Sequence, residues 1–236
     1  MRGVADGFAT HAEIDSLRIH TPNPRGGGSQ IGSWRWDVPD SPPTFRTLVV
    51  RAQAVLREHF GVSSLRFYRS NIITWEGRDP DKQERETWPA QPARWAARSL
   101  HGDTNTDEMF LYTAILYLSQ HGEDVMGAET GIADEVDGDF TVGAGLRVEP
   151  SIGRLLVFSA GVENMHEMLP ATHGQRVAIQ FWFACEGMDP GWAHDQRLAW
   201  AAEHGWGGPS SETRPAVFSP PLSAGLQQAA PWHWRH

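Results

Sequence analysis

The stretch "SLHGDTNTDEMFLYTAILYLS", residues 99–119, places a polar pair directly before one of the most apolar runs of the chain. His101 and Asp103 flank a single glycine, and residues 110–118 are typical of a buried strand. Residues two apart on a strand point to the same face, so both side chains can present ligand atoms to one point. Loop polarity ahead of a buried strand is the alternative, and the choice between them depends on partners elsewhere in the chain.

The composition fits one large domain with an apolar core. The chain has 236 residues, of which 40% are hydrophobic. No run approaches the roughly 18 consecutive apolar residues that a membrane span needs. The first residues lack the apolar core of a signal peptide. The compartment therefore stays open, with the cytoplasm favoured, and the sequence does not predict an oligomeric state.

Charge and cysteine content exclude several classes of function. The formal net charge of −9 is spread along the chain, which argues against nucleic acid as a partner. Cys185 is the only cysteine, so neither an internal disulfide nor a cysteine-rich zinc module can form. Eleven tryptophans suit a core and a recognition surface equally well.

Hydrophobic spacing predicts helices followed by strands. Residues 8–19 are expected to form a short helix. Residues 44–60 are expected to form an amphipathic helix that ends at Gly61. Strand-like runs, separated by Gly, Pro and Asp clusters, follow at 65–75, 110–118, 140–150, 153–160 and 175–184. The order predicts a mainly β (α+β) fold, an antiparallel sandwich or barrel with a helix packed on a sheet.

Two segments fall outside this pattern. Residues 76–99 form a long charged insert, and with its tryptophans it is either a lid over a substrate or a solvated surface loop. Residues 187–236 are expected to be a C-terminal extension that contains one more helix at 191–205. We expect a single domain over residues 1–236 with its core at about 44–186.

A second histidine supplies the partner that the opening pair needs. His166 ends a short apolar stretch before a turn and the last expected strand. Two histidines and one carboxylate make the facial triad that binds Fe(II) and leaves positions open for a cosubstrate and oxygen. His173 competes as the third ligand, although it lies inside the expected turn. Each histidine taken singly is more often a turn residue than a ligand.

The last expected strand has two different faces. One is apolar and should pack under helices: Val177, Ile179, Phe181 and Phe183. The other mixes small, polar and cationic groups, which suits a lined cavity: Arg176, Ala178, Gln180 and Trp182. Arg176 can bind a carboxylate through two hydrogen bonds, although an edge arginine is usually only a solvated charge. A hairpin through "LPATHGQ" would place His166 beside Arg176.

In this order the motifs resemble the 2-oxoglutarate- and Fe(II)-dependent dioxygenase superfamily, in particular its prolyl 4-hydroxylase-like group. The resemblance lies in H-x-D before "AILYLS", in "GAET" (127–130), in "VEPSIGRLLVFS" and in "HEMLPATHGQRVAIQFW". It covers about half of the chain. Two departures are Ala128, where that group commonly has a second glycine, and the long insert before H-x-D.

The resemblance implies a double-stranded β-helix, a jelly-roll or cupin-like core, with flanking N-terminal helices. It implies that Fe(II) is bound by His101, Asp103 and His166, and that Arg176 holds the distal carboxylate of 2-oxoglutarate. Further cosubstrate-lining positions carried over from the family are Tyr68, Tyr117, Thr130 and Trp182. Both tyrosines can alternatively be ordinary strand aromatics.

The activity implied is hydroxylation of an unactivated C–H bond with O2, coupled to release of succinate and CO2, with ascorbate as an optional accessory reductant. Asp103 favours hydroxylation, because related halogenases lack that carboxylate. A prolyl or other peptidyl residue of a peptide or protein is the expected substrate. The alternative is a free amino acid or other small metabolite, and a lesser one is a non-catalytic jelly-roll binding module or a cupin-like isomerase or lectin.

Overall fold

The structure is a computed structural model, and it describes residues 2–21, 29–32, 41–77, 95–96, 99–138 and 141–187. Residues 29–32 and 95–96 are described as backbone only. Most of the insert, the extension after residue 187 and the helix expected at 191–205 lie outside the described residues.

Both expected N-terminal helices are present. Helix α1 (His11–Arg18) starts at a capping box in which the Thr10 side chain accepts from the Glu13 backbone N–H. Helix α2 (Pro43–Phe60) begins with prolines in its first turn and ends at Gly61, whose φ of 67° is left-handed. The two-residue proline entry and the glycine stop therefore mark the bounds of α2 as the sequence indicates.

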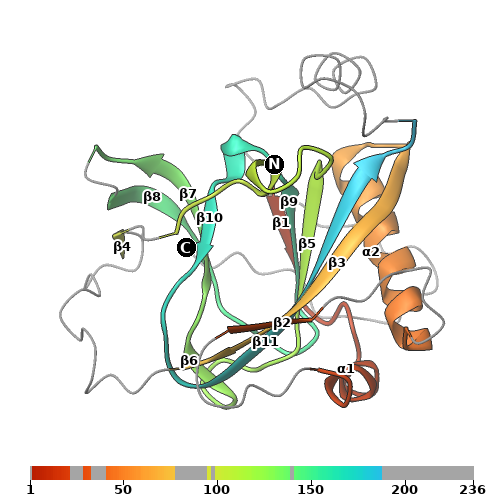
Figure 1. Cartoon of the computed structure of the whole chain (residues 1–236), viewed down its shortest axis with the longest axis horizontal. Helices are drawn as coiled ribbons and strands as arrows, with labels where there is room; N and C mark the ends of the chain where they lie inside the picture. Colours follow the sequence, from red (N-terminus) through yellow and green to blue (C-terminus); the bar gives the residue numbers. More distant parts are fainter. Residues whose placement is uncertain are drawn as a thin grey trace.

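The strands of the described residues form two antiparallel sheets that face each other (Figure 1). The major sheet has the order β1-β9-β5-β11-β3-β2, with β6 paired to β11. Its strands are β1 (Arg2–Ala5), β2 (Ser29–Gly32), β3 (Leu65–Glu76), β5 (Tyr112–Tyr117), β6 (Val125–Gly127), β9 (Leu155–Ser159) and β11 (Ala171–Cys185). This confirms the mainly β fold with flanking helices.

The minor sheet has the order β10-β7-β8-β4. Its strands are β4 (Trp95–Ala96), β7 (Thr130–Val136), β8 (Thr141–Val148) and β10 (His166–Met168). The chain also has two short 3-10 turns. The first, η3 (Asp103–Asn105), lies between β4 and β5, and the second, η4 (Val162–Asn164), precedes β10. The sequence did not predict β7, whose second half carries exposed acidic residues in place of an apolar pattern.

The two faces of β11 divide as the alternation predicts. The apolar face packs with α2 into the larger core, and the rings of Phe45 and Phe181 lie 5.8 Å apart. The opposite face is directed between the sheets, where Ala178 joins a second core with residues of both sheets: Ile115, Tyr117, Ile132, Val148, Leu156 and Phe158. We call this the inner face of the major sheet.

The expected hairpin between His166 and Arg176 is wrong. His166 lies on β10, which pairs with β7 in the minor sheet, whereas Arg176 lies on β11 between β3 and β5. The turn residues mark a crossover between the sheets, and there the carbonyl of Pro170 accepts the backbone N–H of Ala128. No helix among the described residues is long and apolar enough to cross a lipid bilayer.

Candidate metal centre

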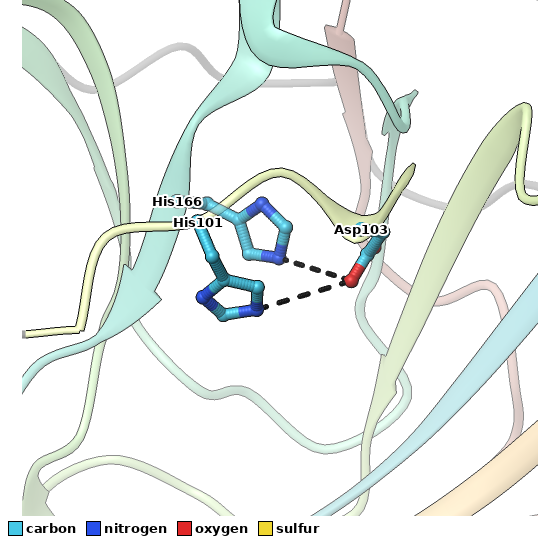
Figure 2. A group of neighbouring side chains, drawn as sticks. All are labelled: His101, Asp103 and His166. Carbon is cyan, nitrogen blue, oxygen red and sulfur yellow. Dashed lines mark ion pairs between the residues drawn. The ribbon is translucent and has the colours of Figure 1, made fainter. Parts of the chain in front are cut away.

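His101, Asp103 and His166 come together at the edge of the minor sheet (Figure 2). Their ligand atoms lie within 4.8 Å of one another. Oδ1 of Asp103 is 3.9 Å from Nε2 of His101 and 3.7 Å from Nε2 of His166. The structure thus places three potential ligand atoms around one point, two nitrogens and one carboxylate oxygen, which suits Fe(II).

A backbone bridge holds the two histidines side by side. The N–H of His101 donates to the carbonyl of His166 at 3.0 Å, and the N–H of His166 donates to the carbonyl of His101 at 2.8 Å. The expected regular strand over H-x-D is therefore wrong, because this bridge is isolated and Asp103 opens η3. Gly102 is nevertheless extended, with φ −97° and ψ 141°, so the side chains of His101 and Asp103 still project to one side.

Backbone carbonyls orient both imidazoles. Nδ1 of His101 lies 2.8 Å from the carbonyl of Ser99, and Nδ1 of His166 lies 3.0 Å from the carbonyl of Asn164. A carbonyl can only accept, so Nδ1 carries the proton and Nε2 keeps a free lone pair. Nε2 of His166 is buried and has no hydrogen-bond partner among the described residues. This arrangement fits a metal ion, which would take the place of the missing partner.

The environment also sets the charge of His166. Burial lowers the pKa of this imidazole, and the nearby His101 lowers it further, while Asp103 acts in the opposite direction. The ring is therefore neutral at neutral pH, as a metal ligand must be.

Thr113 is a site residue that sequence reasoning missed. Its hydroxyl donates to Oδ2 of Asp103 at 2.5 Å, and both side chains are buried. This bond fixes the carboxylate so that Oδ1 faces the histidines. The available signal was a single hydroxyl within the apolar run of residues 110–118, on the same strand face as Tyr117.

A second polar group lies on the inner face around Arg176. Arg176 is 4% exposed, and one of its terminal nitrogens donates to the hydroxyl of Thr130 at 3.3 Å. The hydroxyl of Tyr117 donates to the same oxygen at 2.6 Å, and the guanidinium lies 5.3 Å from the centre of the Tyr117 ring. The structure therefore brings together three of the predicted cosubstrate residues.

Arg176 has no acidic partner within the described part of the chain. Its Nε is buried without a hydrogen bond. Burial lowers the pKa of Arg176 and raises the pKa of Tyr117. A buried cation without a counter-ion is costly, so this place is suited to an anionic ligand.

Tyr68 and Trp182, the other two predicted lining residues, lie outside the group around Arg176. Tyr68 contacts Phe110 edge to face at 5.8 Å, and no contact joins it to the Arg176 group among the described residues. Trp182 stacks on Phe110 with the ring centres 4.6 Å apart. His173, the competing ligand, is exposed and its Nδ1 lies 3.3 Å from the hydroxyl of Thr172, so the structure does not bring it into the triad.

Comparison with known proteins agrees with this geometry. Residues 92–184 match the family model described as the 2OG-Fe(II) oxygenase superfamily. The matched stretch is less than half of the chain, and it contains the triad, Thr130 and Arg176. Fe(II), 2-oxoglutarate and O2, which the sequence predicts as cofactor and cosubstrates, are those of a 2OG-Fe(II) oxygenase.

Two curated relatives share the oxygenase region. A mouse "2-oxoglutarate and iron-dependent oxygenase domain-containing protein 3" is 31% identical over 141 residues, which are 60% of this chain and 40% of the relative. A chicken "Prolyl 3-hydroxylase 2" is 27% identical over 194 residues, 76% of this chain and 26% of the relative. The chain thus spans about a quarter to two-fifths of the length of these relatives.

A solved structure shares the fold. It is a prolyl hydroxylase from Trichoplax adhaerens in complex with a hypoxia inducible factor peptide fragment. It is 15% identical, the TM-score is 0.54, and the match covers 78% of this chain and 84% of that one. This confirms the jelly-roll core that the sequence predicts.

Proposed function

We propose that this chain is an Fe(II)- and 2-oxoglutarate-dependent dioxygenase that hydroxylates an unactivated C–H bond, with release of succinate and CO2. One observation carries the proposal: a triad with an unpaired buried nitrogen lies on the same inner side as a buried arginine without a counter-ion. The first calls for a metal cation and the second for an anion, and 2-oxoglutarate is an anion that also chelates iron.

His101, Asp103 and His166 would hold the iron. The iron, once bound, supplies the activation of O2 and the oxidising power for the C–H bond. The protein fixes the three ligand atoms by its own contacts: carbonyl oxygens hold the two imidazoles, and Thr113 holds the carboxylate. Asp103 fills the position that a halide would otherwise take, so hydroxylation is favoured over halogenation.

Arg176 would bind the distal carboxylate of 2-oxoglutarate. Its guanidinium can form a bidentate, charge-assisted pair with that group. Thr130 accepts hydrogen bonds from Arg176 and Tyr117, and these contacts keep the guanidinium in place. Burial excludes water around the pair and so strengthens it. Trp182 and Tyr68 line the end of the inner face nearer to Thr113.

A prolyl or other peptidyl residue is the proposed substrate. The relatives support this, since one is named a prolyl 3-hydroxylase and the solved structure is a prolyl hydroxylase in complex with a peptide fragment. The alternative is a free amino acid or other small metabolite. A non-catalytic binding module is the lesser candidate, because it would have no use for an intact triad together with Arg176.

Anaerobic addition of Fe(II) and 2-oxoglutarate tests the proposal directly. The complex should give a weak charge-transfer band at about 500 nm. Under air, the protein should form succinate, and mass spectrometry of peptide and amino-acid mixtures should find a product heavier by one oxygen atom. Failure to form the band, together with no effect of the His166→Ala substitution, would remove the iron site.

A further inference from the structure

Two carboxamides lie opposite each other on the inner face of the major sheet. Asn71 of β3 and Gln180 of β11 are directly paired in the strand register, so their side chains point to the same side. Oδ1 of Asn71 is buried and has no hydrogen-bond partner among the described residues, and the side chain of Gln180 is half-buried beside it. Buried polar atoms without a partner are rare in folded proteins, so the oxygen of Asn71 needs an explanation.

The indole of Trp182 is a third unpaired polar group on this face. Trp182 follows Gln180 by two residues and therefore shares its direction. It is 5% exposed, and its Nε1–H, which can only donate, has no partner within the described part of the chain. Stacking on Phe110, with the two rings 7° from parallel, fixes the position of the ring.

These three groups lie beside the proposed iron site. Trp182 is paired with Thr113 of β5, and Thr113 holds the carboxylate of Asp103. Gln180 is paired with Ile115 of β5, one step further along the strand. Since Arg176 lies four residues before Gln180 on β11, the unpaired groups occupy the end of the inner face that is away from the proposed cosubstrate anchor.

The chemistry of the three groups is neutral and mixed. The indole donates, and each carboxamide both donates and accepts. A peptide group is also neutral and offers one donor and one acceptor, so it can satisfy an indole N–H and an amide oxygen together. A free carboxylate would instead require a cation in a buried place. Arg69, which is paired with Trp182, is the cation on this rung, and its side chain is exposed.

We propose that Asn71, Gln180 and Trp182 form a subsite that binds a backbone amide of an extended peptide substrate next to the reacting residue. This inference rests on the proposed oxygenase function and deepens it, because it names a peptide over a free amino acid. The substrate amide takes the hydrogen-bonding positions that the fold leaves empty.

The test compares blocked peptides with free amino acids. The probes are a mixture of N-acetyl-Ala-X-Ala-amide tripeptides, with X varied, and the matching mixture of free amino acids. Hydroxylated products are detected by mass spectrometry, and the KM of the best substrate is then measured. The wild-type protein should hydroxylate the blocked tripeptides in preference to the free amino acids.

Two substitutions remove the polar groups and keep an apolar side chain in their place. Asn71→Leu replaces a carboxamide that has no partner in the fold, and Trp182→Phe removes the N–H while it keeps a ring on Phe110. Each should raise the peptide KM about tenfold, the effect of one lost hydrogen bond to a buried group. The KM for 2-oxoglutarate should not rise with it. Arg69→Ala on the same rung is the matched control and should leave the peptide KM unchanged.

Three outcomes would overturn the inference. The first is hydroxylation of free amino acids alone. The second is an unchanged peptide KM in both Asn71→Leu and Trp182→Phe, whether or not the KM for 2-oxoglutarate rises. The third is an intact charge-transfer band with no product from any blocked tripeptide. Absence of the band itself would instead overturn the proposed function, so the two failures can be told apart.

Discussion

Thr113 and Asp103 form the contact that fixes the geometry of the triad. The Thr113 hydroxyl donates to one carboxylate oxygen of Asp103, and this leaves the other oxygen directed at the two imidazoles. The strand β5 thereby joins the major sheet to Asp103, a proposed metal ligand that is carried by η3. The position of the Asp103 carboxylate therefore depends on the apolar strand β5 as well as on the polar turn η3.

Substitution of Thr113 by valine should weaken metal binding. Valine keeps the branched shape and removes the donor, so Asp103 can rotate. Loss of such an outer contact typically lowers metal affinity by about 10- to 100-fold. Anaerobic Fe(II) titration, followed through the charge-transfer band with 2-oxoglutarate, measures the change.

Thr113→Ser is the matched control, because serine retains the hydroxyl and should keep most of the affinity. Circular dichroism of both variants checks that the fold is unchanged. Equal Fe(II) affinity of the valine and the wild-type proteins would show that the contact does not position the ligand.

Replacement of His166 by alanine should abolish Fe(II) binding and the band. His166 contributes the most buried nitrogen of the triad, and no neighbouring described side chain can take its place. The control is His173→Ala, since His173 is exposed and lies outside the triad. A band that survives in His166→Ala and disappears in His173→Ala would show that His173, and not His166, is the third metal ligand.

Removal of the Arg176 guanidinium should weaken 2-oxoglutarate binding by about 2–3 kcal/mol, the scale of hydrogen bonds to a charged group. Arg176→Ala leaves the carboxylate without a cation, whereas Arg176→Lys keeps the charge and loses the second hydrogen bond. The KM for 2-oxoglutarate should therefore rise in the order wild type, lysine, alanine. Unchanged KM in the alanine variant would remove Arg176 from the cosubstrate site.

The two faces of β11 could be predicted because a strand has a period of two. Val177 and Phe181 fall on the helix side, and Arg176 falls on the inner side, as the alternation requires. The pattern is local, uninterrupted and strongly apolar on one face. The same reasoning identifies Tyr117, which shares the inner side of β5.

Long-range pairing could not be predicted in the same way. Pro170 and Gly174 signal a turn, but a turn signal does not say whether the next strand joins the same sheet. Here the chain changes sheets, so His166 and Arg176 lie in different sheets and are not strand neighbours.

Irregular strand pairing explains the position of Tyr68. The register of β3 against β11 shifts between Trp182 and Phe183, and Tyr68 is the residue left without a partner in that register. Alternation does not hold across a bulge, so the direction of Tyr68 cannot be read from its position in the sequence. The structure places its ring against Phe110.

Stability should depend on pH through His59, at the end of α2. The half-buried ring lies under β1, where a Cβ added to Gly3 would be 3.0 Å from it. Burial lowers the pKa of His59 below its ordinary value. On acidification below about pH 6.5, the unfolded chain therefore takes up a proton before the folded one does, and the free energy of unfolding falls.

Urea unfolding of wild type and His59→Gln, measured across this range, isolates the effect, because contributions of distant groups cancel in the difference. The wild type should lose stability relative to the variant as the pH falls, and a difference that does not change with pH would contradict the assignment.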